Sequence, residues 1–259
     1  MNIIDWTKYV DHIFCMTYLP SNRLNEISKT LMNVNIDINN PKFFSFIYDY
    51  EHKIFLNEYD NMRQKSYEFI NINLEYDGMK LKKPYIFDVA LSIYRTLKIA
   101  QYFNYNRIIL FEDDIIFLKD LNYIIKAMDF LKTQNFDMCI CQSIFCDTWR
   151  GIKSYLKNEE GCEDLGNDMF MKTNDPLGIY DAGFNILTKD GINKIVKLFE
   201  DHNIVSSLDV LIALKKGIIN NFNICFALKP LCIQKCMLDL DINFLQTLNA
   251  NINIKEYIE

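Results

Sequence analysis

Two patterns of apolar and polar positions divide most of the chain: short apolar runs, and apolar residues spaced three or four apart. The short runs favour strands and lie at His12–Leu19, Phe43–Tyr48, Arg107–Phe111, Asp137–Cys141, Ile179–Leu187 and Asn223–Leu228. The wider spacing favours helices and occupies Arg23–Asn35, Ile86–Phe103, Leu121–Leu131, Lys189–Glu200 and Ser206–Lys215. Because strands and helices alternate, the sequence predicts an α/β/α sandwich with a mostly parallel central sheet.

Three stretches carry neither pattern. The stretch Asn57–Lys83 is polar and is expected to form a long loop on the surface. The stretch Asp147–Pro176 is expected to be a long irregular loop, and loops of this length usually carry functional residues. Residues 239–259 are expected to form a C-terminal tail. Residues 1–238 are therefore expected to make one domain, a size that α/β domains commonly reach.

Composition and charge narrow the classes of protein. Of the 259 residues, 50% are hydrophobic and 24% are charged, which is typical of a globular protein. The net charge of −6 and the lack of a basic cluster argue against a nucleic-acid partner. No apolar run approaches the roughly 20 residues that a transmembrane helix needs, although peripheral attachment to a membrane stays open.

The cysteines and the first residues of the chain indicate the cellular compartment. The sequence contains 8 of them, and its first residues show no signal-peptide pattern, so a reducing cytoplasm is expected, with attachment to the inner face of a membrane still compatible. Cys139, Cys141, Cys225 and Cys232 sit among apolar residues and are expected to be buried thiols. Cys232 and Cys236 lack a second ligand pair, which argues against zinc.

Three acids, Glu112, Asp113 and Asp114, directly follow the run Arg107–Phe111. Such a continuous apolar run is typical of a central strand, and ligands of open α/β sheets bind beyond the carboxyl ends of the strands. Since side chains alternate along an extended chain, Glu112 and Asp114 are expected on one side and Asp113 on the other. The acids could instead end the strand in solvent, but the apolar stretch Ile115–Leu118 that follows favours a site.

Adjacent carboxylates beside a buried strand predict a bound cation. The carboxylates repel one another, so some must take up protons unless a positive charge compensates them. Their hard oxygen atoms select Mg²⁺ or Mn²⁺, which complete their coordination with water and phosphate oxygens. The acids therefore predict a divalent metal ion and, with it, a diphosphate substrate.

An ordered series of motifs resembles glycosyltransferase family 25, the lipopolysaccharide and collagen galactosyltransferase type with a GT-A fold. The matching segments are Tyr18–Arg23, Asp88–Ile93 with Ser92, the acids Glu112–Asp114, Gly183–Leu187 followed by Gly191, Asp209, and Pro230–Gln234. One segment departs from the family: Asp88, Val89 and Ile93 stand where the family has Gly, Cys and His. The departure bears more on the donor sugar than on the fold.

The resemblance implies transfer of a hexose, galactose among the candidates, from a UDP-sugar to a glycan or lipid-linked saccharide, with inversion at the anomeric carbon. A metal held by Asp114, with Glu112 assisting, would neutralise the departing diphosphate. Asp113 would reach ribose or sugar hydroxyls. The remaining nucleotide-binding residues implied are Ser21, Arg23 and Ser92; for Ser21 and Arg23 the alternatives are a helix cap and a solvated charge.

Inversion requires a base that deprotonates the acceptor hydroxyl. The resemblance favours Asp209, which could instead stabilise a helix N-terminus, and Asp181 is the second candidate because Gly183 beside it would allow substrate to approach the backbone closely. Two other functions stay open. One is a nucleotidyltransferase, although the loop Leu19–Arg23 lacks glycine. The other is a nucleotide-sugar-binding protein without catalysis.

Overall fold

A computed structural model describes residues 3–18, 23–49, 64–66, 68, 84–117, 120–142, 162–165, 169–173, 183–205, 208, 222–227 and 231–234. Its helices are α1 (Arg23–Asn33), α3 (Pro84–Tyr102), α4 (Leu121–Thr133) and α6 (Lys189–His202), with a 3-10 turn η1 (Trp6–Lys8). Its strands are β1 (His12–Tyr18), β2 (Phe44–Asp49), β3 (Arg107–Glu112), β4 (Ile115–Phe117), β5 (Met138–Ile140), β6 (Cys162–Asp164), β7 (Phe170–Thr173), β8 (Phe184–Thr188), β9 (Ile224–Ala227) and β10 (Cys232–Gln234).

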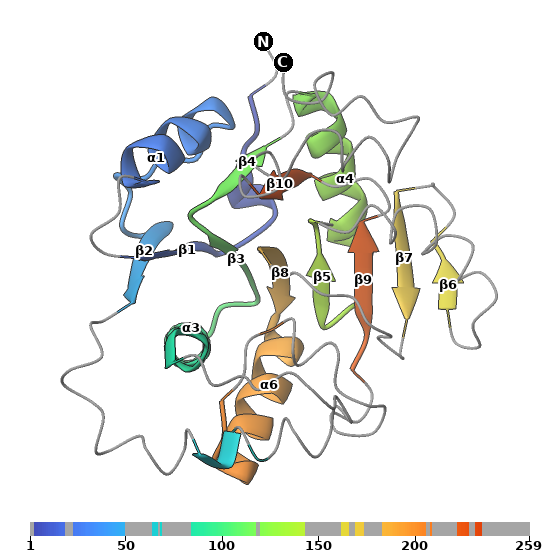
Figure 1. The fold of residues 1–259 in the computed structure, drawn as a ribbon. Helices are drawn as coiled ribbons and strands as arrows, with labels where there is room; N and C mark the ends of the chain where they lie inside the picture. The colour runs from blue at the N-terminus through green and yellow to red at the C-terminus, as the bar shows by residue number, and fades with distance from the viewer. Residues whose placement is uncertain are drawn as a thin grey trace, which may run out of the picture.

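The central sheet has the strand order β2-β1-β3-β8-β5-β9-β7-β6 (Figure 1). Strands β2, β1, β3, β5, β9 and β6 run in one direction, and β8 and β7 run against them. The predicted mostly parallel sheet is therefore confirmed, with two reversed strands inserted. Strands β4 and β10 pair antiparallel in a second, small sheet.

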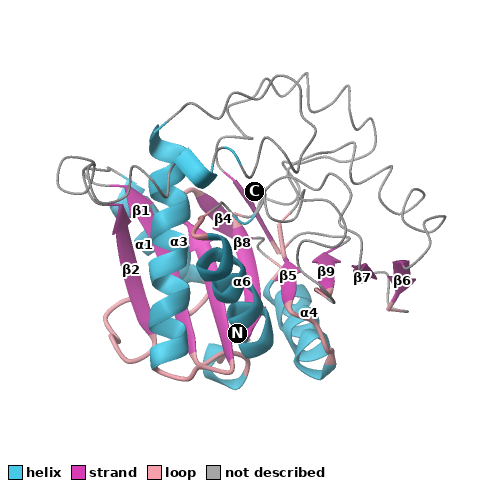
Figure 2. Cartoon of the chain, turned by 90° about the horizontal axis from the view of Figure 1, so that it is seen from below, coloured by secondary structure: helices cyan, strands magenta, loops and turns pink. Residues whose placement is uncertain are grey.

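Helices cover both faces of the central sheet, as an α/β/α sandwich requires. Alternate residues of β3 show the division: Ile109 and Phe111 join the core under α1 and α4, whereas Ile108 and Leu110 join the core under α3 and α6. Figure 1 shows the two helix pairs on opposite sides, and Figure 2 shows α3 and α6 lying along the strands. The apolar run that predicted a central strand is therefore buried on both faces.

Capping side chains and residues with left-handed φ angles define several helix ends. The Asp120 side chain accepts a hydrogen bond from the Tyr123 N–H at the start of α4, and Thr188 accepts one from Gly191 N–H at the start of α6. Beyond the ends of α3 and α6, Asn104 and Asn203 adopt left-handed φ angles of 57° and 51°. The predicted helix boundaries at these ends lie within two or three residues of the observed ones.

One prediction about the fold is wrong. The stretch Asp147–Pro176 was expected to be irregular, but within it β6 and β7 extend the central sheet. These strands could not be recognised in the sequence, because three or four residues are too few to show the alternation of apolar and polar positions. Most of Asn57–Lys83, the predicted helix after Ser206, and the tail 239–259 lie outside the described residues.

Two further expectations concern the cysteine thiols and membrane-spanning helices. Five cysteines are buried and carry free thiols, as expected for the last four of them: Cys15, Cys139, Cys141, Cys225 and Cys232. Among the helices that the structure describes, none combines the length and the apolar character that crossing a bilayer would demand.

Candidate functional site

The acids lie where the chain passes from the central sheet to the small sheet. Strand β3 ends at Glu112, a turn contains Asp113 and Asp114, and β4 begins at Ile115. The neighbouring reversed strand β8 secures this end, because the Glu112 N–H donates to the Gly183 carbonyl at 2.9 Å. The acids therefore occupy the carboxyl end of β3, the position predicted from the sequence.

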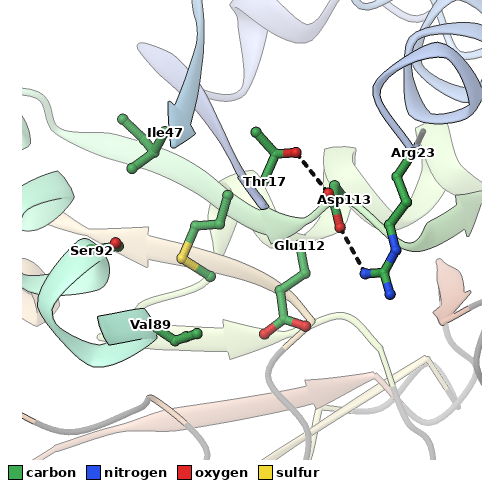
Figure 3. A pocket seen from close by; sticks show the side chains of 8 residues that line it. Thr17, Arg23, Ile47, Val89, Ser92, Glu112 and Asp113 are labelled. Carbon is green, nitrogen blue, oxygen red and sulfur yellow. Dashed lines mark hydrogen bonds and ion pairs between the residues drawn. The ribbon is translucent and has the colours of Figure 1, made fainter. Parts of the chain in front are cut away.

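A pocket of about 150 Å³ opens beside the acids. Residues from β1, β2, α1, α3 and the end of β3 line it: Met16, Thr17, Arg23, Ile47, Val89, Ser92, Glu112 and Asp113 (Figure 3). One wall is apolar, and the opposite wall carries two carboxylates and a guanidinium. Such a mixture of apolar surface with a few convergent polar groups is typical of a small-molecule site.

A hydrogen-bonded chain joins Thr17, Asp113 and Arg23. The Thr17 hydroxyl donates to Asp113 Oδ2 at 2.7 Å, and Arg23 Nη1 donates to Asp113 Oδ1 at 3.1 Å (Figure 3). The Asp113 side chain is 6% exposed, whereas that of Arg23 is 56% exposed. A nearly buried carboxylate is thus held by a fixed hydroxyl on one oxygen and by a more exposed cation on the other.

Asp114 has a different environment. Its Oδ1 atom is buried and accepts no hydrogen bond within the described part of the chain. Burial raises the pKa of Asp114 above its usual value, the Arg23 charge opposes this rise, and the Asp113 charge adds to it. A buried carboxylate oxygen without a donor is costly unless another group compensates it.

The oxygen atoms at this site would fit a divalent cation whose remaining ligands come from outside the protein. Among the described residues, no three His, Cys, Asp or Glu side chains converge as a complete ligand set. Mg²⁺ and Mn²⁺ are commonly held by one or two carboxylates together with water and substrate phosphates. Asp114 Oδ1, which is buried and has no hydrogen-bond donor among the described residues, and the neighbouring carboxylates are ligand atoms of that kind.

The structure brings four of the predicted site residues to one pocket: Arg23, Ser92, Glu112 and Asp113. Ser92 reaches it from α3, where its side chain is buried. Ser21, Asp181 and Asp209 lie outside the described residues. Glu112 and Asp113 were expected on opposite sides of an extended chain, but strand β3 ends at Glu112 and Asp113 lies in the turn that follows. Both residues therefore line the same pocket.

Sequence reasoning missed four residues that line the pocket: Met16, Thr17, Ile47 and Val89. Thr17 had a usable signal, because it lies near the carboxyl end of the predicted strand His12–Leu19, and β1 pairs in parallel with β3. A threonine in an apolar run nevertheless reads as an ordinary strand former. Its role depends on Asp113, which is distant in the sequence.

No protein-family profile matches the chain, and no curated protein matches it either. Among solved structures, it is similar to the inositol-1-phosphate CTP transferase from T. maritima, with 11% identity, a TM-score of 0.38, and 96% of this chain and 98% of that chain covered. It is also similar to mouse xyloside xylosyltransferase 1 in its apo form, with 12% identity, a TM-score of 0.35, and 78% and 79% covered.

Proposed function

We propose that this protein is a metal-dependent glycosyltransferase that moves a hexose from a UDP-sugar to a hydroxyl of a glycan or lipid-linked saccharide, with inversion. The observation that carries the proposal is the convergence of Glu112, Asp113, Arg23 and Ser92 on one pocket at the carboxyl edge of the sheet. The resemblance to glycosyltransferase family 25 supplies the donor and acceptor classes, and galactose is the first donor sugar to test.

Asp114 and Glu112 are the proposed metal ligands. When bound, Mn²⁺ or Mg²⁺ would neutralise the charge that develops on the departing diphosphate. Asp114 supports this assignment because its buried Oδ1 has no donor among the described residues, and it is adjacent in sequence to a second carboxylate that lines the pocket. The remaining ligands would come from phosphate oxygens and water.

The other pocket residues would bind and orient the nucleotide. Arg23 carries a planar guanidinium suited to paired hydrogen bonds with phosphate oxygens. Ser92 would contribute a hydroxyl from α3, and Ser21 a second one from the loop before α1. Asp113, held by Thr17, would accept hydrogen bonds from ribose or sugar hydroxyls with its remaining lone pairs.

Asp209 or Asp181 is the proposed base that takes the proton of the acceptor hydroxyl. The Gly183 carbonyl accepts a hydrogen bond from the Glu112 N–H. Gly183 follows Asp181 by two residues in the sequence and lies beside the acids. Replacing each aspartate by asparagine assigns the role: the base is the residue whose loss abolishes transfer while UDP binding is kept. If both variants transfer normally, neither residue is the base.

The proposal is tested by calorimetric titration of UDP with and without Mn²⁺, followed by hydrolysis assays with UDP-galactose, UDP-glucose and UDP-N-acetylhexosamines. We expect UDP binding to require the metal and at least one donor to be hydrolysed. Asp114→Asn should lower turnover on the order of 100-fold or more, because a group that stabilises the developing charge is lost. Its far-ultraviolet circular dichroism and melting temperature should stay close to those of the wild type.

Asp190→Asn is the matched control, because Asp190 is an exposed aspartate in the first turn of α6. It should keep full activity. Full activity of Asp114→Asn would remove the metal role assigned to that residue. Metal-dependent UDP binding without hydrolysis of any donor would favour the non-catalytic binding protein, and formation of a nucleotide-sugar from CTP or UTP and a sugar phosphate would favour the nucleotidyltransferase.

A further inference from the structure

Arg23 supplies positive charge to the acids in the structure described here. Its Nη1 atom lies 3.1 Å from Asp113 Oδ1, and Asp113 stands between Glu112 and Asp114 in the sequence. Neighbouring carboxylates repel one another, and a cation beside them reduces this repulsion. The arginine therefore does, without an ion, part of what a divalent cation would do for the same acids.

The two partners of Asp113 differ in how easily they can leave. Thr17 belongs to β1, is buried, and pairs with Tyr48 of the neighbouring strand β2. Arg23 is the first residue of α1, and its side chain is 56% exposed. Departure of the guanidinium would leave Asp113 with its hydroxyl donor, so the carboxylate keeps its position while its countercharge changes.

We infer that Arg23 and the divalent cation are alternative countercharges for Asp113 and Asp114, and that the diphosphate of the ligand draws Arg23 away from the acids as the metal binds. The inference rests on the proposed function. It follows from three observations: the ion pair, the exposure of its cationic member, and the suitability of a planar guanidinium for paired hydrogen bonds with phosphate oxygens. The arginine thereby discourages metal binding until nucleotide is present.

The consequence is a pair of effects with opposite signs. Removing the Arg23 charge should strengthen binding of Mn²⁺ alone, because a cation beside the ion site is lost and the acids lose their countercharge. The same change should weaken UDP binding in the presence of Mn²⁺, because a phosphate contact is lost. A residue that only supports the fold would weaken both.

The test is titration of the full chain with Mn²⁺, following the paramagnetic resonance signal of the free ion, without UDP and at saturating UDP. We expect Arg23→Gln to bind Mn²⁺ alone on the order of tenfold more tightly than the wild type, since a unit charge a few ångströms from the ion is removed. Arg23→Lys, which keeps the charge, should stay near the wild type. Lys29→Gln is the matched control, because Lys29 is an exposed cation on the same helix.

The outcomes separate this inference from the proposed function. Tighter binding of Mn²⁺ by Arg23→Gln, with unchanged binding by Lys29→Gln, supports the inference. Equal or weaker binding by Arg23→Gln overturns it, while UDP-dependent Mn²⁺ binding by the wild type keeps the proposed function. An equal gain in Lys29→Gln would show a general effect of net charge and would also overturn it. Failure of the wild type to bind Mn²⁺ under either condition would remove both.

Discussion

Thr17 shows how much one hydroxyl can matter at the residue scale. It donates to Asp113 Oδ2 at 2.7 Å inside the pocket, and both side chains are nearly buried. Thr17→Val keeps the shape but leaves a buried carboxylate oxygen without this donor, so we expect a loss of about 1–3 kcal/mol in the free energy of unfolding. We also expect weaker UDP binding, because Asp113 and its partner Arg23 lose their position.

Urea unfolding and UDP titration check both effects, and Thr17→Ser serves as the control because it keeps the hydroxyl. A Thr17→Val variant with wild-type UDP affinity would show that Thr17 contributes to stability alone.

The candidate site could be predicted only where residue type and local pattern agree. Glu112, Asp113 and Asp114 were found because charged residues that directly follow a buried run are unusual. Arg23 and Ser92 were found through the family resemblance. Thr17 could not be found in this way, because its significance comes from a hydrogen bond to a residue far along the chain.

At the scale of secondary-structure elements, a close contact between α6 and the start of β5 depends on Gly191. A Cβ atom at this position would lie 2.1 Å from the carbonyl oxygen of Asp137, a backbone atom that also accepts the Thr188 N–H. We expect Gly191→Ala to lower the free energy of unfolding by roughly 3 kcal/mol, because the helix must shift outward, which outweighs the better helix propensity of alanine.

Thermal and urea unfolding measure the change, and Lys189→Ala, at an exposed position in the first turn of the same helix, should stay within about 0.5 kcal/mol of the wild type. The same shift would disturb Asp137, whose Oδ2 accepts hydrogen bonds from Lys194 Nζ and from the Asn223 N–H, each at 2.7 Å. A neutral Gly191→Ala variant would mean that the helix and strand can separate without cost.

Elements with long, regular patterns could be predicted from the sequence, and elements defined by partners could not. Strand β3 and helix α3 have continuous apolar runs or helical spacing, and both lie where expected. The three- and four-residue strands β6 and β7 were missed, because only pairing with β9 makes the second of them a strand. The reversal of β8 also escaped prediction, since the direction of a strand is decided by connections and not by its own residues.

At the scale of the whole molecule, β1 links the candidate site to the opposite edge of the sheet. Thr17 lies at the pocket end of this strand, and His12 begins it at the other end. Because β1 pairs with both β2 and β3, it is central to one half of the sheet. A change that weakens the His12 end should therefore destabilise the fold as a unit.

His12 gives the fold a dependence on pH. The ring is buried, its Nε2 lies 2.9 Å from Ser45 Oγ, and it stacks on the Tyr105 ring with centroids 5.2 Å apart. Burial lowers the pKa of His12 from its usual value of 6.5, although the Lys42 carbonyl opposes this. The folded state thus favours the neutral ring, and this contribution is fully present above pH 6.5.

As the pH falls below 6.5, the unfolded chain takes up a proton that the folded chain resists, so the free energy of unfolding decreases by up to about 1.4 kcal/mol for each unit by which the pKa is lowered. Urea unfolding between pH 8 and pH 5 measures this slope. We expect His12→Gln to flatten it, because glutamine cannot titrate. Parallel curves for the wild type and His12→Gln would assign the acid sensitivity of the fold to other groups.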